Sequence, residues 1–272
     1  MSEAPRYVVV LSAEDPVASA VADRWGLGAA TGLTIDGAAV RDLAPGIVTL
    51  RRPGFHVRDE RLANLVPEEW VAERVPFVFP SIHSSAAGQR GLTVHPLGNV
   101  GALTDVGGRP RSLVPSAPRL MVAALRRLAE AAGPETGPAS YEATHHGPFL
   151  PVPAFFAEIG FADDPAPPPT AVGALAEVLT GLEEEPRDRV VLGVGGGHYA
   201  PHFSELALER HVAFGHIIGR HALPEVTPEI ARQAWDGTPA VEGIVYARAA
   251  DVAPPWSELG PRLRDAELGP RR

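Results

Sequence analysis

Short apolar runs alternate with amphipathic stretches along most of the chain. The apolar runs, rich in Val, Ile and Phe, predict strands over 7–11, 47–50, 76–80, 92–95, 154–159, 190–192, 215–221 and 241–246. The amphipathic stretches predict helices over 17–25, 67–74, 120–132, 170–182, 203–214 and 228–234. Alternation of this kind is typical of an α/β domain. We therefore expect one three-layer domain over residues 1–272, in which helices flank a mixed, largely parallel sheet.

The chain opens with a strand, a turn and a helix. Ser12 and Asp15 lie in the turn, and Pro16 follows. Asp15 suits the N-cap of the helix and Pro16 suits its first residue. Because ligands of α/β domains gather at the carboxyl ends of strands, Ser12 and Asp15 are also candidates for substrate binding. At the other end of the chain, residues 254–272 show no clear core pattern and are expected to form a tail.

The stretch 193–202 reads Gly-Val-Gly-Gly-Gly-His-Tyr-Ala-Pro-His and follows the predicted strand 190–192. Its three successive glycines permit a sharp turn and let a ligand approach main-chain N–H groups. Two imidazoles four positions apart come directly after the turn. A strand end, a glycine turn and two imidazoles together favour a functional site over a surface turn. The candidate residues are Gly195, Gly196, Gly197, His198, Tyr199 and His202.

Two more groups of histidines occur in the chain, and the first of them follows predicted strands. His83 and Ser84 come after one strand, and His95 and Asn99 come at the end of the next. Strand ends that meet at one edge of a sheet bring such side chains to one cleft. All four are therefore candidates for substrate binding, although each histidine also suits a hydrogen-bonded position in the core.

The second group is the segment 141–148, Tyr-Glu-Ala-Thr-His-His-Gly-Pro. Adjacent side chains of an extended segment point to opposite sides, so we expect one histidine to enter the cleft and the other to support it. Glu158 lies near the end of the next predicted strand, where a carboxylate beside imidazoles acts as a general base or a metal ligand. Its alternative role is a structural hydrogen bond. The candidate catalytic residues are His145, His146, His198, Glu158 and Glu142.

Composition limits the chemistry and the partners. The 272 residues include no cysteine, which excludes disulfides, thiolate ligands and a cysteine nucleophile. The net charge is −9, and every basic side chain is an arginine. This acidity argues against nucleic-acid binding except through a local basic cluster. The densest cluster, which we take as the candidate contact for an RNA backbone, is Arg109, Arg111, Arg119, Arg126 and Arg127.

The apolar run over residues 7–11 is too short for a signal sequence or a membrane span. The chain also shows no internal repeat and no linker long enough to require a second domain. We therefore expect a cytoplasmic monomer that has no membrane contact and no obligate protein partner.

Three segments together resemble the archaeal and plant type of D-aminoacyl-tRNA deacylase. They are 92–99, Leu-Thr-Val-His-Pro-Leu-Gly-Asn; 142–148, Glu-Ala-Thr-His-His-Gly-Pro; and 192–202, Leu-Gly-Val-Gly-Gly-Gly-His-Tyr-Ala-Pro-His. Weaker agreement occurs over 12–19, 79–88, 158–160 and 215–217. The resemblance therefore covers most of the chain in the right order.

The resemblance implies an enzyme that hydrolyses the ester between a D-amino acid and the 3′ end of tRNA. It further implies zinc as a cofactor and a fold similar to those of phosphorylases and peptidyl-tRNA hydrolases. Zinc held by imidazoles lowers the pKa of a bound water to ~7, which suits ester hydrolysis. For the ligands we expect His198 and His202 with either His145 or His146, of which His145 is the first choice.

The substrate would be held by small, polar and aromatic groups around this centre. The N–H groups of the glycine turn would stabilise an oxyanion or bind a phosphate or ribose. The full set of candidate substrate-binding residues is Ser12, Asp15, His83, Ser84, His95, Asn99, Thr144, Gly195, Gly196, Gly197, Tyr199 and His216.

Two other functions fit the same residues. One is a zinc-dependent amidohydrolase or peptidase that acts on a small molecule through the same histidines. The other is a non-catalytic nucleotide-binding module whose glycine turn holds a phosphate. The second leaves the histidines without a role, and a chain without lysine has no Gly-Lys-Ser phosphate loop.

Overall fold

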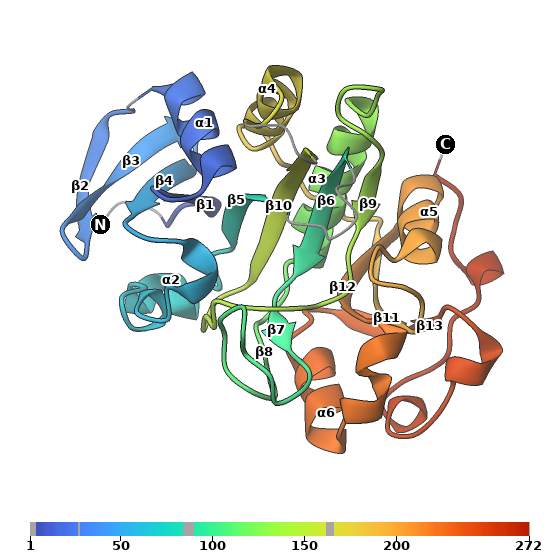
Figure 1. Ribbon diagram of the computed structural model, residues 1–272. Coiled ribbons are helices and arrows are strands. Elements are labelled where there is room, and N and C mark those ends of the chain that lie inside the picture. Colours follow the sequence, from blue (N-terminus) through green and yellow to red (C-terminus); the bar gives the residue numbers. More distant parts are fainter. Residues whose placement is uncertain (1–3, 27, 84–89, 162–165, 272) are drawn as a thin grey trace.

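The computed structural model describes residues 4–26, 28–83, 90–161 and 166–271. Within these residues, eight strands form a central sheet in the order β2-β3-β4-β1-β5-β10-β6-β9 (Figure 1). These strands are β1 (Tyr7–Ser12), β2 (Ala30–Ile35), β3 (Ala38–Ala44), β4 (Ile47–Arg52), β5 (Phe77–Ile82), β6 (Arg90–Pro96), β9 (Ala139–Tyr141) and β10 (Ala154–Phe161). Strands β4, β1, β5 and β10 run parallel, whereas β6 pairs antiparallel with β10.

Five further strands of the described residues lie outside the central sheet. Three of them form a parallel sheet in the order β12-β11-β13, and the other two, β7 and β8, form an antiparallel pair. They are β7 (Gly98–Asn99), β8 (Ser112–Leu113), β11 (Arg189–Val194), β12 (Val212–Ile218) and β13 (Val241–Tyr246).

Most helices begin at a proline, whose fixed φ suits the first helical position. The helices are α1 (Pro16–Trp25), α2 (Glu68–Ala72), α3 (Pro118–Glu130), α4 (Pro169–Val178), α5 (Pro201–Glu209) and α6 (Pro228–Asp236). Short 3₁₀ turns cover His56–Arg58, Leu62–Asn64, Arg220–Glu225, Ala249–Asp251, Trp256–Glu258 and Asp265–Glu267. None of the described helices has the length and apolar character that crossing a membrane requires.

Three apolar cores hold these elements together. Helices α1, α3 and α4 pack on one face of the central sheet (Figure 1). The opposite face packs against α2 and the 3₁₀ turns that precede it. The third core lies between the sheet β12-β11-β13, α6 and Trp256. The predicted α/β class, with a mixed, mostly parallel sheet flanked by helices, is confirmed.

Several boundaries differ from the sequence prediction, among them those of the strand predicted over 215–221, which is β12 over Val212–Ile218. The helix predicted over 203–214 begins at Pro201 and ends at Glu209, because the wholly buried strand β12 already begins at Val212. The segment 254–272 lacks a sequence pattern, yet Trp256 and Leu268 are buried in the cores. Its isolated apolar residues fill gaps between elements rather than forming a periodic face. That residues 1–272 form one domain stays a prediction.

Candidate functional site

The pairing of β10 with β6 places polar side chains on one face of the sheet. Glu158 lies opposite Thr93, and Phe156 lies opposite His95. Because alternate residues of a strand share a face, Thr93, His95 and Glu158 point to the same side. His95 Nε2 lies 3.6 Å from Glu158 Oε1, and its ring stacks on Phe156. These three side chains therefore form one part of the site, on a single face of the sheet next to the carboxyl end of β5.

His83 joins two buried carboxylates at the end of β5. Its Nδ1 lies 3.1 Å from Glu142 Oε1 and 3.2 Å from Glu158 Oε2. Its Nε2 lies 3.1 Å from the hydroxyl of Tyr199, in the loop before α5. Glu142, which follows β9, also has its Oε2 3.0 Å from His198 Nε2. Segments far apart in the sequence thus meet at one pair of carboxylates.

Three imidazoles extend this cluster. The ring of His145 lies 4.1 Å from that of His95 and 4.4 Å from that of His146, between centroids. His145 Nδ1 donates to Ala143 O at 2.8 Å, and His146 Nδ1 donates to Gly147 O at 2.7 Å. A backbone carbonyl that holds the Nδ1 proton leaves the Nε2 lone pair free, which is the usual arrangement of a metal-binding histidine.

Burial and mutual contacts set the charges. Burial alone would lower the pKa of His83, but the carboxylates of Glu142 and Glu158, which face its Nδ1 at 3.1 Å and 3.2 Å, outweigh it and raise this pKa to about 11. Burial would raise the pKa of each carboxyl, but the facing imidazoles lower it instead. Burial, with the charge of His95, lowers the pKa of His146 to about 4. At neutral pH the cluster therefore combines ionised carboxylates and a protonated His83 with neutral rings of His145 and His146, while the contact with Glu158 outweighs burial and raises the pKa of His95.

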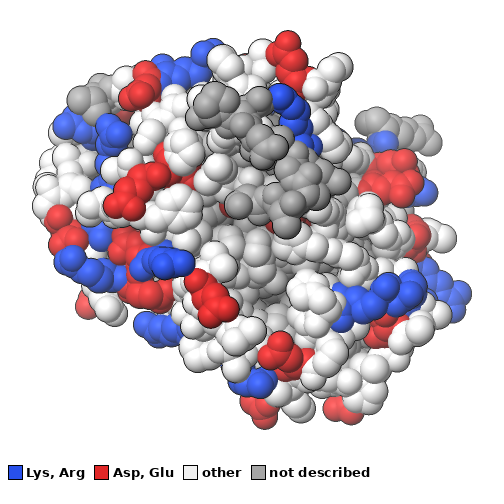
Figure 2. Space-filling view, viewed as in Figure 1, with Lys and Arg blue, Asp and Glu red and all other residues white. Residues whose placement is uncertain are grey.

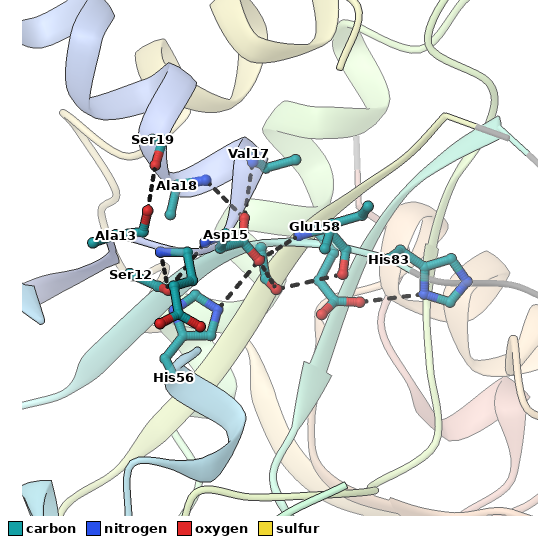
Figure 3. Close-up of polar contacts among 12 residues, drawn as sticks. Ser12, Ala13, Asp15, Val17, Ala18, Ser19, His56, His83 and Glu158 are labelled. Carbon is teal, nitrogen blue, oxygen red and sulfur yellow. Dashed lines mark hydrogen bonds and ion pairs between the residues drawn. The ribbon is translucent and has the colours of Figure 1, made fainter. Parts of the chain in front are cut away.

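A second polar cluster, centred on Asp15, holds the carboxyl end of β5 in place (Figure 3). Asp15 Oδ1 accepts hydrogen bonds from the N–H groups of Val17 and Ala18 and so caps α1. Its Oδ2 accepts from the Ser81 hydroxyl at 2.8 Å and from the Ile82 N–H at 3.0 Å. Asp15 thereby ties the start of α1 to the strand that carries His83.

The donor set suits a divalent metal ion with mixed nitrogen and oxygen ligands. Three overlapping groups of described residues each bring three ligand atoms within 4.8 Å of one another. Within the described residues, neither carboxylate oxygen of Glu142 accepts a well-directed hydrogen bond, although imidazole nitrogens face both. The groups are His95 with His145 and His146, Glu142 with His145 and His198, and His83 with Glu142 and Glu158.

Comparison with known proteins gives this site its context. A family model described as D-aminoacyl-tRNA deacylase matches residues 73–252, more than half of the chain. The chain belongs to the D-aminoacyl-tRNA deacylase family. The resemblance drawn from the sequence is thereby confirmed. The small-molecule hydrolase and the nucleotide-binding module are not favoured.

Curated relatives named D-aminoacyl-tRNA deacylase match with substantial identity. The protein of Thermoplasma acidophilum is 38% identical over 168 residues, which cover 62% of this chain and 65% of that protein. The protein of Methanoregula boonei is 46% identical over 201 residues, which cover 70% of this chain and 45% of that protein. The matched part thus spans less than two thirds of either relative.

The fold of this deacylase-family chain has a solved counterpart. The crystal structure of AF0625, described as a conserved protein of unknown function, aligns with a TM-score of 0.79 and 24% identity. The alignment covers 95% of this chain and 91% of that one. This similarity shows a shared fold.

The structure brings most of the predicted site residues of the deacylase-family chain together. They are His83, His95, Glu142, His145, His146, Glu158, His198 and Tyr199. Both adjacent histidines belong to the cluster, so the expectation that they point to opposite sides is wrong. The reason is the backbone of His146, whose φ of 39° breaks the extended geometry.

The predicted ligand His202 lies elsewhere. Its Nε2 is 3.8 Å from Asp265 Oδ1, and it belongs to none of the described ligand groups. Ala200, with a φ of 41°, turns the chain between His198 and His202, so the four-residue spacing does not correspond to one helix face. Glu142 takes its place as the third candidate ligand beside His145 and His198.

The glycine turn has a partly structural role. Gly195 and Gly196 adopt φ values of 94° and 78°. The N–H of Gly195 donates to Ile218 O at 2.9 Å, so it is not free for an oxyanion. A Cβ on Gly195 would also collide with the Asp251 carboxylate. The predicted role of Gly196 and Gly197 in substrate binding stays a prediction.

Other substrate-binding candidates support the scaffold. Asn99 donates to Gly107 O at 2.9 Å, and the Thr144 hydroxyl lies 3.1 Å from His216 Nδ1 in the core. Ser12 donates to Gly54 O and accepts from the Asp15 N–H. These contacts explain their polar side chains without a ligand. Ser84 lies outside the described residues.

The five arginines do not form one exposed surface. Arg126 is buried against Asp188, and Arg127 donates to Gly181 O. Figure 2 shows side chains of both charges intermixed around the edge of the visible face. The sequence prediction of a local basic cluster for RNA is therefore wrong for Arg126.

Sequence reasoning missed Thr93. This residue is buried beside Glu158 and lines the largely apolar cavity next to the cluster. The sequence did contain a signal: Thr93 lies two positions before His95 in the same predicted strand, and alternate residues of a strand share a face.

Proposed function

We propose that this protein hydrolyses the ester bond of D-aminoacyl-tRNA and releases the D-amino acid and tRNA. The observation that carries the proposal is His83 held between Glu142 and Glu158 in the family-matched part of the chain. This arrangement supplies an ionised base and a protonated acid side by side, as ester hydrolysis requires. The relatives that match are named D-aminoacyl-tRNA deacylase.

The roles of the two main groups follow from their charges. Glu158 is ionised and would accept a proton from the attacking water as it adds to the ester carbonyl carbon. His83 is protonated and would donate a proton to the 3′-oxygen of tRNA as the acyl C–O bond breaks. The Tyr199 hydroxyl, 3.1 Å from His83 Nε2, orients this ring.

We also propose that Glu142, His145 and His198 hold zinc. Their ligand atoms lie within 4.8 Å of one another, and the contact of His145 Nδ1 with Ala143 O directs Nε2 inward. Imidazole and carboxylate groups are the ligands of catalytic zinc sites. Zinc supplies a Lewis acid that polarises the ester carbonyl and makes water more acidic. We further place the protein in the cytoplasm as a monomer, with tRNA as its macromolecular partner.

The test is deacylation of matched D-tyrosyl-tRNA and L-tyrosyl-tRNA by the purified protein, with and without a strong chelator. We expect loss of only the D-ester, abolished by the chelator and restored by zinc. Hydrolysis of neither ester, or of both equally, contradicts the deacylase proposal. D-specific activity that survives the chelator removes zinc and keeps the deacylase.

Two variants separate the roles of the carboxylates. Glu158→Gln should lower the rate about 10²- to 10⁴-fold while the zinc content, measured by mass spectrometry, stays the same. Glu142→Gln should lower both the rate and the zinc content. Glu185→Gln, a change in an exposed pair with Arg187, is the matched control and should change neither. Full activity in Glu158→Gln would exclude Glu158 as the base.

A further inference from the structure

A cavity of about 490 Å³ opens directly beside the cluster. Strands β6 and β9 form one wall, and α5 forms the other. His83 and Tyr199, which belong to the cluster, also line the cavity, so the two are continuous. Small-molecule sites of proteins measure about 300–1,000 Å³, so this cavity has the size of a ligand pocket and has room for a side chain.

A buried hydroxyl in this cavity lacks a partner. Thr93 lines the cavity with an exposure of 2%. Within the described part of the chain, its Oγ1 makes no hydrogen bond. Burying an unpaired hydroxyl costs free energy, so such groups usually have a partner in the functional state. Because Thr93 lies opposite Glu158 in the sheet, a ligand atom that paired with this hydroxyl would lie next to the proposed catalytic base.

The charged side chains at the rim of the cavity indicate which part of the substrate it holds. Glu205 and Glu209 are exposed one turn apart on α5, on the side that faces the cavity. The guanidinium of Arg90, on the opposite wall, donates to Glu135 O at 3.2 Å. Among the described lining residues, the two carboxylates outnumber the one guanidinium, so the rim is net negative; it repels the phosphate that the terminal adenosine carries and attracts the ammonium of an aminoacyl group. The rim therefore favours the aminoacyl end of the substrate.

We propose that this cavity receives the side chain of the D-amino acid, and that the Thr93 hydroxyl bonds the aminoacyl group next to the ester. This inference rests on the proposed deacylase activity. Leu208 of α5 lines the cavity and is half-buried, so its size limits the side chains that enter.

The test compares kcat/KM for D-tyrosyl-tRNA and D-alanyl-tRNA in three proteins. Leu208→Trp should lower the ratio of D-tyrosyl to D-alanyl activity by roughly tenfold or more, because a bulkier wall excludes the larger side chain. Leu208→Ala is the matched variant and should leave that ratio unchanged or raise it. Thermal unfolding of both variants checks that they fold.

Thr93→Val tests the hydroxyl. It should lower kcat/KM on both esters by roughly tenfold, since the proposed bond reaches a part that both substrates share. An equal loss on both esters in Leu208→Trp would overturn the inference and assign the cavity to the terminal adenosine. Unchanged ratios in both Leu208 variants would also overturn it. Inactivity of the unmodified protein on either ester would instead refute the deacylase proposal.

Discussion

The buried ion pair of Arg126 and Asp188 gives a stability prediction whose size follows from its contacts. Arg126 Nη2 lies 3.0 Å from Asp188 Oδ1, and its Nη1 pairs with Oδ2. The same guanidinium donates to Ala207 O and Arg210 O at 2.9 Å each. It thereby joins α3 to the connector before β11 and to the end of α5.

Arg126→Met removes the cation and leaves Asp188 buried. Removing one partner of a buried ion pair costs about 3–5 kcal/mol. Asp188 keeps His211, whose Nδ1 lies 3.3 Å away, so we expect the lower part of this range. The measurement is urea unfolding at pH 7, with the free energy extrapolated to water.

Two comparisons make the test specific. Arg232→Met, at an exposed position of α6, should change the free energy of unfolding by less than about 0.5 kcal/mol. The double variant Arg126→Met, Asp188→Leu should lose at least about 2 kcal/mol less than the sum of the two single changes. An Arg126→Met protein as stable as Arg232→Met would refute the reasoning.

Two further predictions concern buried polar groups. Burial lowers the pKa of His216 to about 4, so the folded state favours the neutral ring. The contribution of His216 to the free energy of unfolding is complete above pH ~6.5 and falls by about 3 kcal/mol as the pH drops towards 4. In urea unfolding, the free energy of His216→Leu should therefore depend less steeply on pH than that of the unmodified protein. An unchanged slope contradicts this prediction. Asp15→Asn leaves one amide oxygen for two pairs of donors and should cost about 1–3 kcal/mol in the same assay. Thr227→Ala, which removes a single N-cap bond on α6, should cost about 1 kcal/mol, and an equally small loss in Asp15→Asn would refute the second contact.

The local sequence pattern was sufficient to predict those elements whose structure depends mainly on their own residues. The apolar run over 7–11 is the core of β1, and Asp15 with Pro16 starts α1 as their cap and N1 preferences require. The α/β class follows from the alternation of such units. By contrast, β2 lies mainly exposed at the sheet edge and carries no alternating pattern, so sequence reasoning did not find it.

The sequence by itself also determined which chemical groups are available to a site. It places histidines and acidic residues next to predicted strand ends and glycine turns, where ligand sites form. Only the tertiary structure decided which of them meet. His146 and Ala200 both adopt positive φ, a choice that tertiary contacts impose and spacing does not reveal. The first brings His145 and His146 to one side, and the second turns His202 away from His198. Glu142 and Thr93 gained their places through strand pairing between distant segments, which depends on the whole fold.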